Sequence, residues 1–156
     1  WFLNYRQSSG NWIISKKGGG SHLIDSLETC GMASLLCDQD AGSRGLFVDF
    51  FGRPASTFKS IALLAMEYDA VLVVGGGRRL PRTESTRTNW IPFELATQAV
   101  IDSRDFNSSN ALHELTQAYT TALEQLIRRS PEQYFWIHRR WKSEPRQRKR
   151  KAQNAA

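Results

Sequence analysis

The sequence has few cysteines, no long apolar run and no leader pattern. Its two cysteines, Cys30 and Cys37, are too few for a disulfide framework and show no metal-ligand spacing, so we expect a reducing compartment. The longest apolar run, Ile61 to Met66, is far shorter than the roughly 20 residues of a membrane-spanning helix. The chain begins at Trp1 without a charged and apolar leader. We therefore expect an upstream piece outside this sequence, and no crossing of a bilayer by these residues.

Composition and charge indicate one globular domain with a basic end. Of the 156 residues, 40% are hydrophobic and 23% are charged, which is usual for a folded domain. The net charge of +6 is concentrated between Arg128 and Lys151, a stretch that holds only Glu132 and Glu144 as acidic residues. Such an end favours an anionic partner such as phosphate, a lipid headgroup or nucleic acid. We expect residues 1–145 to form one domain and residues 146–156 to form a basic disordered tail.

Strand-like and helix-like patterns alternate along the chain, which predicts an α/β fold. The predicted strands are residues 11–15, 32–40, 46–51, 70–79 and 90–102, the last two as a hairpin. The predicted helices are residues 21–31, 58–69 after a Ser56-Thr57 cap, and 110–127. Because residues 32–40 read as a buried parallel strand, residues 70–79 as another buried strand, and strands alternate with helices, we expect a mixed, mostly parallel sheet flanked by helices.

A further helix is predicted from Pro131, because Ser130, Pro131 and Gln133 are placed as in a capping box. Rings and basic side chains share this helix: Tyr134, His138, Trp141, Arg139, Arg140 and Lys142. One interpretation is a core helix with a solvated basic face. Rings beside basic side chains also suit an anionic lipid surface or single-stranded nucleic acid.

A polar cluster follows the apolar run that ends at Cys37. It consists of Asp38, Gln39 and Asp40, with Arg44 beyond a glycine-containing loop. A simple turn is the structural alternative, since Asp, Gly and Ser are common turn residues. The functional interpretation is a ligand site at the end of a strand, where Arg44 would hold a phosphate through paired hydrogen bonds. The glycine run at 75–77 lacks a nucleotide-binding fingerprint and predicts a bulge or a close backbone approach.

Two blocks of sequence resemble signature blocks of a known family. They are DQDAGSRGLFVDFFGRPASTF (38–58) and SPEQYFWIHRRWKSEP (130–145). Both are similar to the lipid A biosynthesis acyltransferases, the lauroyl and myristoyl transferase-like branch of the lysophospholipid acyltransferase superfamily. The resemblance covers residues 11 to 145. It implies that residues 1–145 are the carboxyl-terminal part of one acyltransferase domain, incomplete at its amino-terminal side.

The resemblance also implies a reaction. A fatty acyl chain would move from acyl carrier protein or acyl-CoA to a hydroxyl of a phosphorylated glycolipid, without a metal or organic cofactor, at the cytoplasmic face of the bacterial inner membrane. The family's general base is a His followed, after four residues, by Asp or Glu. The residues five beyond His22, His113 and His138 are Leu27, Ala118 and Ser143, so no histidine here carries that motif. We expect a fragment that is inactive alone and is anchored by a segment outside this chain.

Carried over residue by residue, the resemblance implies two sets of site residues. The acceptor-binding set is Asp38, Gln39, Asp40 and Arg44, and the membrane-facing or headgroup-facing set is His138, Arg139, Arg140, Trp141 and Lys142. An anionic membrane surface is expected as the partner of the second set, and nucleic acid is not. Two alternatives stay open: a noncatalytic acyltransferase-like protein that binds lipid, and a nucleic-acid-binding module.

Overall fold

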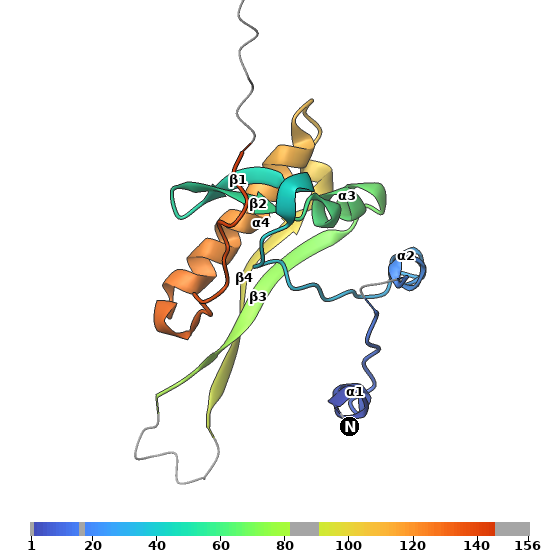
Figure 1. Ribbon diagram of the computed structural model, residues 1–156. Coiled ribbons are helices and arrows are strands. Elements are labelled where there is room, and N and C mark those ends of the chain that lie inside the picture. The colour runs from blue at the N-terminus through green and yellow to red at the C-terminus, as the bar shows by residue number, and fades with distance from the viewer. Residues whose placement is uncertain (1, 16–17, 82–90, 146–156) are drawn as a thin grey trace, which may run out of the picture. The chain divides into compact units, whose positions relative to one another are not determined.

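The computed structural model describes residues 2–15, 18–81 and 91–145, and the chain divides into two compact units, residues 1–35 and 36–156 (Figure 1). The predicted tail, residues 146–156, lies outside the described residues. None of the helices in the described ranges is both long and apolar enough to cross a membrane.

The first unit holds two helices, α1 (Phe2–Gln7) and α2 (Gly20–Glu28). Helix α2 confirms the helix predicted in residues 21–31. The strands predicted at 11–15 and 32–40 are wrong, because neither segment is in a strand and both leave large apolar side chains such as Trp12 and Met32 exposed. Apolar content alone does not make a strand, since the main chain also needs a hydrogen-bonding neighbour.

The second unit begins with a tight hairpin of β1 (Leu46–Phe50) and β2 (Arg53–Thr57). Phe51 and Gly52 form its two-residue turn, with φ of 56° and 73°. Positive φ at both turn positions matches the twist of the flanking strands. The first strand was predicted, but the Ser56-Thr57 helix cap is wrong: both residues are buried in β2, and α3 (Lys59–Glu67) starts after Phe58.

A longer hairpin joins β3 (Val71–Arg79) to β4 (Phe93–Asp102), as predicted. Its register shifts at Val74/Gly75, where the glycine run begins. A Cβ on Gly75 would lie 2.7 Å from the carbonyl oxygen of Ala96, and one on Gly76 would lie 3.0 Å from Leu126. The predicted bulge and close approach are therefore confirmed.

The described strands form two separate two-stranded antiparallel sheets. The α/β class is confirmed, but the mostly parallel sheet is wrong for this part of the chain. Both hairpins connect strands that are neighbours in sequence. The segment predicted as a buried parallel strand, residues 32–40, is in no strand.

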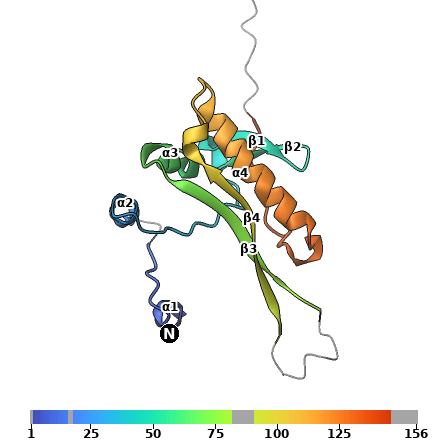
Figure 2. The ribbon, with the colours of Figure 1, turned by 180° about the vertical axis from the view of Figure 1, so that it is seen from behind.

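Helix α4 (Ala111–Arg128), also predicted, is the central element of the second unit and packs against α3 and both hairpins (Figure 2). Leu115 and Tyr119 from α4 form one buried cluster with Ala62 and Ala65 from α3, against one face of β3–β4. Ile127 forms a second cluster with Phe50 and Ala55, to which Leu123, Tyr134 and Trp141 add. The opposite face of β3–β4 is exposed, and Val73, Leu95 and Val100 lie on it.

The helix predicted from Pro131 is wrong. A 3-10 turn, η3 (Pro131–Gln133), is followed by an extended Tyr134, with φ −79° and ψ 140°. The Gln133 side chain does not complete a capping box. It accepts a hydrogen bond from the Arg79 N–H and donates one to the Arg79 carbonyl, both at 2.8 Å. This long-range pairing with the end of β3 competes with the local signal and replaces it.

Candidate functional site

The two blocks of sequence at 38–58 and 130–145 lie together in the structure. We call residues 134–143 the carboxyl-terminal segment. The Tyr134 hydroxyl donates to the carbonyl oxygen of Asp38 at 3.2 Å, across 96 residues of sequence. Ser143 donates its N–H and its hydroxyl to the two carboxylate oxygens of Asp40 at 3.1 and 2.9 Å, across 103 residues. The carboxyl-terminal segment therefore fastens the loop that contains Asp38 and Asp40.

Asp40 acts as the anchor of this loop. Besides both donors of Ser143, its carboxylate accepts the N–H of Gly42 at 2.8 Å, and the side chain is half-buried. Three donors from the protein use most of the accepting capacity of the carboxylate. Asp40 is thus placed to hold the loop, and its predicted role in acceptor binding has little chemical support.

Strand β2 fixes the same loop from the other side. The Ser56 carbonyl accepts the N–H of Ala41 at 3.2 Å, and the Ser56 hydroxyl donates to the Gly42 carbonyl at 2.6 Å. Ser56 is completely buried. The 3-10 turn η1 (Gly42–Arg44) is consequently held between β2 and the carboxyl-terminal segment.

Arg140, predicted to face a membrane, is instead 1% exposed. Its guanidinium donates to the Ser56 carbonyl at 2.6 Å and to the Thr57 hydroxyl at 2.7 Å, and lies 5.1 Å from the Phe50 ring. Burial lowers the pKa of Arg140, while Tyr134 and Asp40 act in the opposite direction. A headgroup-facing role for this side chain is wrong, because the side chain is buried and directs its two hydrogen bonds to the end of β2.

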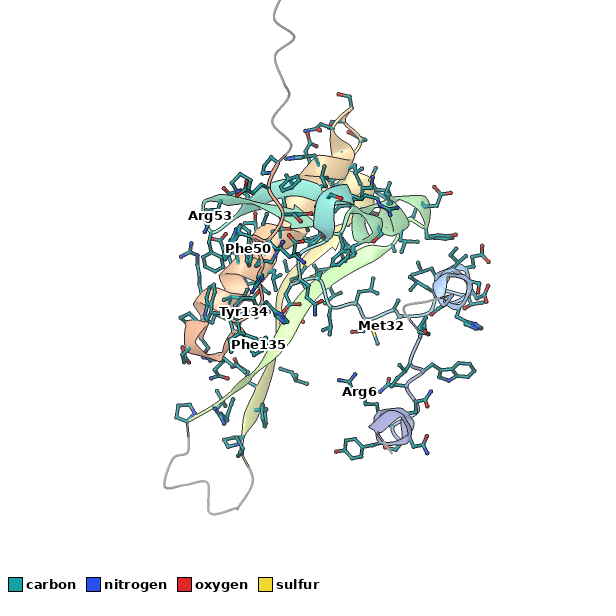
Figure 3. The ribbon with its side chains drawn as sticks, viewed as in Figure 1. Arg6, Met32, Phe50, Arg53, Tyr134 and Phe135 are labelled. Atoms are coloured by element: carbon teal, nitrogen blue, oxygen red, sulfur yellow. The ribbon has the colours of Figure 1, made fainter. Side chains whose placement is uncertain are left out.

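Trp141 is also part of the interior cluster. Its ring lies 5.7 Å from the Phe50 ring, and the Arg53 guanidinium lies 5.1 Å above it. Figure 3 shows Phe50, Arg53 and Tyr134 on one side of the unit. The predicted headgroup-facing role of Trp141 therefore does not fit its packing.

His138 is half-buried with its ring 4.6 Å from Phe135, and only Arg139 and Lys142 of the predicted set are exposed.

The remaining residues predicted to bind an acceptor are at the surface of the loop. Gln39 and Arg44 are exposed, and Asp38 is half-buried. Among the described residues, Arg44 has no hydrogen bond or ion pair to Asp38 or Asp40, so its guanidinium is available to a ligand. The structure places these residues on one loop before β1, rather than at the end of a parallel strand.

Several titratable side chains surround Arg140, and their pKa values are raised. Burial, followed by the charge of Asp38, raises the pKa of Tyr134 to about 12 and also raises that of the Cys37 thiol. Burial likewise raises the pKa of Tyr119, whose hydroxyl donates to the Phe58 carbonyl at 2.8 Å. All three groups hold their protons at neutral pH. None of them is suited to act as a general base there.

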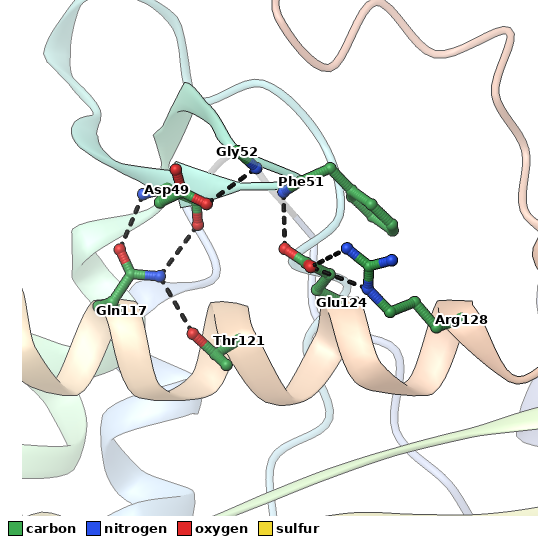
Figure 4. Close-up of polar contacts among 7 residues, drawn as sticks. All are labelled: Asp49, Phe51, Gly52, Gln117, Thr121, Glu124 and Arg128. Carbon is green, nitrogen blue, oxygen red and sulfur yellow. Dashed lines mark hydrogen bonds and ion pairs between the residues drawn. The ribbon is translucent and has the colours of Figure 1, made fainter.

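Helix α4 holds the β1–β2 turn in place (Figure 4). Gln117 accepts the Asp49 N–H at 2.8 Å and donates to the Asp49 carbonyl at 3.0 Å. Glu124 accepts the Phe51 N–H at 2.6 Å and pairs with Arg128, whose guanidinium lies 4.8 Å from the Phe51 ring. Side chains from α4 therefore satisfy the open edge of β1 and fix the position of Phe51.

Sequence reasoning missed the residues that hold the two blocks together. Ser143 had no recognisable signal, and Ser56 and Thr57 read as a helix cap. Tyr134 was noticed as a ring on a helix stripe, but its hydroxyl contact with Asp38 depends on a turn that the sequence pattern did not predict.

Comparison with protein families gives a match to the model described as bacterial lipid A biosynthesis acyltransferase, over residues 1–143. A search of curated proteins returned no match.

Proposed function

This chain belongs to the bacterial lipid A biosynthesis acyltransferase family, and on that premise we propose that it is the acceptor-binding part of an acyltransferase. The reaction moves a fatty acyl chain from acyl carrier protein or coenzyme A to a hydroxyl of a phosphorylated glycolipid. The acceptor oxygen attacks the thioester carbonyl, the thiolate leaves, and a base takes the hydroxyl proton. The family is associated with the inner membrane, and we place this chain at its cytoplasmic face.

One observation carries the proposal: the two blocks that resemble the family's signatures form a single structural unit. Asp40 and Ser143 join them, and Arg140 ties the second block to the end of β2. The loop between Asp38 and Arg44 is thereby held rigid, with Gln39 and Arg44 exposed. A guanidinium on a fixed loop is suited to binding a phosphate through paired hydrogen bonds.

The described residues supply binding rather than base catalysis. No histidine has Asp or Glu five residues later, and the pKa values of Tyr134 and Cys37 are raised. We therefore do not assign the base to Tyr134, Cys37 or a histidine of this chain. Asp38, Gln39 and Arg44 are proposed to bind the acceptor, and Asp40 to position the loop that carries them.

Binding of a lipid A precursor, with and without its phosphate groups, tests this proposal. The purified chain is titrated with each lipid in detergent micelles. We expect the phosphorylated lipid to bind more tightly and Arg44→Ala to weaken it about tenfold, as for the loss of a charge-assisted contact. Arg104→Ala is the matched control, because this exposed arginine already pairs with Asp102 at 2.6 Å. Equal binding of both lipids, or equal loss in both variants, would contradict the acceptor site.

A further inference from the structure

Three consecutive large apolar residues are exposed in the carboxyl-terminal segment. Phe135, Trp136 and Ile137 are 55%, 46% and 81% exposed. Single exposed apolar side chains are normal on a protein surface, but a contiguous group usually marks an interaction site. We call these three residues the aromatic loop. In Figure 3, Phe135 lies beside Tyr134, on the side of the unit where α4 ends.

The aromatic loop is held by hydrogen bonds and ring contacts. The Trp136 N–H donates to the Tyr134 carbonyl at 2.9 Å, and the His138 N–H donates to the Phe135 carbonyl at 3.1 Å. The Trp136 ring packs edge-on against Tyr134 at 4.8 Å and Phe51 at 5.6 Å, and Phe51 is itself fixed by α4. A loop that is already ordered loses little conformational entropy when it binds.

The one side-chain donor of the aromatic loop, the Trp136 indole N–H, is satisfied within the protein, which lowers the cost of its entry into an apolar medium. The Trp136 indole N–H donates to the Pro131 carbonyl at 2.7 Å, so the ring has no free donor. An unpaired N–H would be costly to bury in hydrocarbon, because no water is present there to accept its hydrogen bond. The main-chain N–H groups of Trp136 and His138 are likewise paired within the segment.

Basic side chains border the aromatic loop. Arg139 and Lys142 follow it and are exposed. Arg128 is 60% exposed, and stacks over Phe51, which contacts Trp136. Arg129 is exposed as well, Glu132 and Glu144 are the exposed acidic residues on either side, and Glu124 is engaged by Arg128, so four basic residues stand against three acidic ones. The border is therefore net positive, and its charge complements an anionic surface.

We propose that the aromatic loop inserts into the interfacial region of an anionic lipid bilayer, with Arg139 and Lys142 contacting the headgroups. Trp is favoured at the boundary between headgroups and acyl chains, and neighbouring Lys and Arg add attraction to an anionic leaflet. Ile137, the most exposed of the three, offers no ring on which a base stacks, so nucleic acid explains it poorly. Arg140 and Trp141 do not take part, because they are packed against Phe50.

Flotation with vesicles tests the insertion. The full chain is mixed with vesicles of phosphatidylglycerol and phosphatidylcholine, or of phosphatidylcholine alone, at low and high salt. A Phe135→Ser, Ile137→Ser double variant is expected to bind anionic vesicles at least tenfold more weakly, since two apolar side chains no longer enter the interface. The double variant Arg139→Gln, Lys142→Gln is expected to lose about fivefold in affinity for anionic vesicles for each charge removed. Its vesicle binding should also depend less on salt concentration.

A matched control removes exposed apolar side chains elsewhere in the same unit. Leu95 and Val100 are at least as exposed as Phe135, and lie on the open face of β3–β4. The double variant Leu95→Ser, Val100→Ser is expected to bind anionic vesicles with an affinity within about twofold of that of the unsubstituted chain, as for surface substitutions outside a binding site. The basic residues after Pro145 are present in every variant, so their attraction does not account for a difference between the two pairs.

Two outcomes overturn the proposal. The first is equal binding of the Phe135, Ile137 variant and the unsubstituted chain, or an equal loss in the Leu95, Val100 control. The second is a loop variant that keeps its vesicle affinity but loses affinity for a single-stranded oligonucleotide, which would assign the surface to nucleic acid. The vesicles contain no phosphorylated glycolipid, so this result is independent of the Arg44 test.

Discussion

Arg140 is the residue on which the carboxyl-terminal segment depends most. It is 1% exposed and donates to Ser56 and Thr57 at the end of β2, although its Nε is buried without a partner among the described residues. Arg140→Ala would leave a cavity and two buried acceptors with fewer donors. We expect the free energy of unfolding to fall by about 2–4 kcal/mol, less than two full charge-assisted bonds and a cavity would give together.

Urea denaturation of this variant, compared with Arg139→Ala, measures the effect. Arg139 is exposed and adjacent in sequence, so its substitution is expected to change the free energy of unfolding by no more than about 0.5 kcal/mol. Arg140→Lys should lie between the two, because one ammonium does not reproduce the planar fork of a guanidinium. Equal stability of the Arg139 and Arg140 variants would show that the buried contacts do not hold the segment.

At the scale of elements, the helices and strands that local sequence patterns determine were predicted correctly, and those that depend on contacts between distant residues were not. Helices α3 and α4 and the β3–β4 hairpin were predictable, because periodicity and turn residues are encoded within each segment. The strands predicted at 11–15 and 32–40 required neighbours that the described residues do not provide. Strand β2 was missed because Ser56 and Thr57, which are buried through pairing with β1, resemble a helix cap.

The candidate site shows the same difference between residues that are close in sequence and contacts between distant residues. Asp38, Gln39, Asp40 and Arg44 were predicted together because they are neighbours in one loop. The engagement of Asp40 by Ser143 was not predictable, since it joins residues 103 positions apart. The burial of Arg140 was not predictable for the same reason. A basic residue next to aromatic residues is expected at the surface unless the distant groups that accept its hydrogen bonds are known.

The β1–β2 turn gives a prediction at this scale. Gly52 has φ of 73°, and a Cβ at this position would meet no atom within 4 Å, so a side chain there is opposed only by the backbone conformation. Gly52→Ala is expected to lower the free energy of unfolding by about 1 kcal/mol, and Gly52→Asn by less, because Asn tolerates left-handed φ. Thermal unfolding of the two variants compares them directly. If Asn costs as much as Ala, the penalty does not come from the turn.

For the whole molecule, the division between binding and catalysis leads to the last prediction. The described groups near the candidate site include protonated phenols and a protonated thiol, and no histidine in the sequence is followed at the required distance by an acid. The purified 156-residue chain is therefore expected to transfer no labelled acyl group from acyl carrier protein to a lipid A precursor. An active enzyme of the same family, assayed in parallel, shows that donor and acceptor are competent. Transfer by this chain would mean that one of its own groups acts as the base, and Asp38→Asn would then be the first variant to assay, because Asp38 is a carboxylate on the same loop as Arg44.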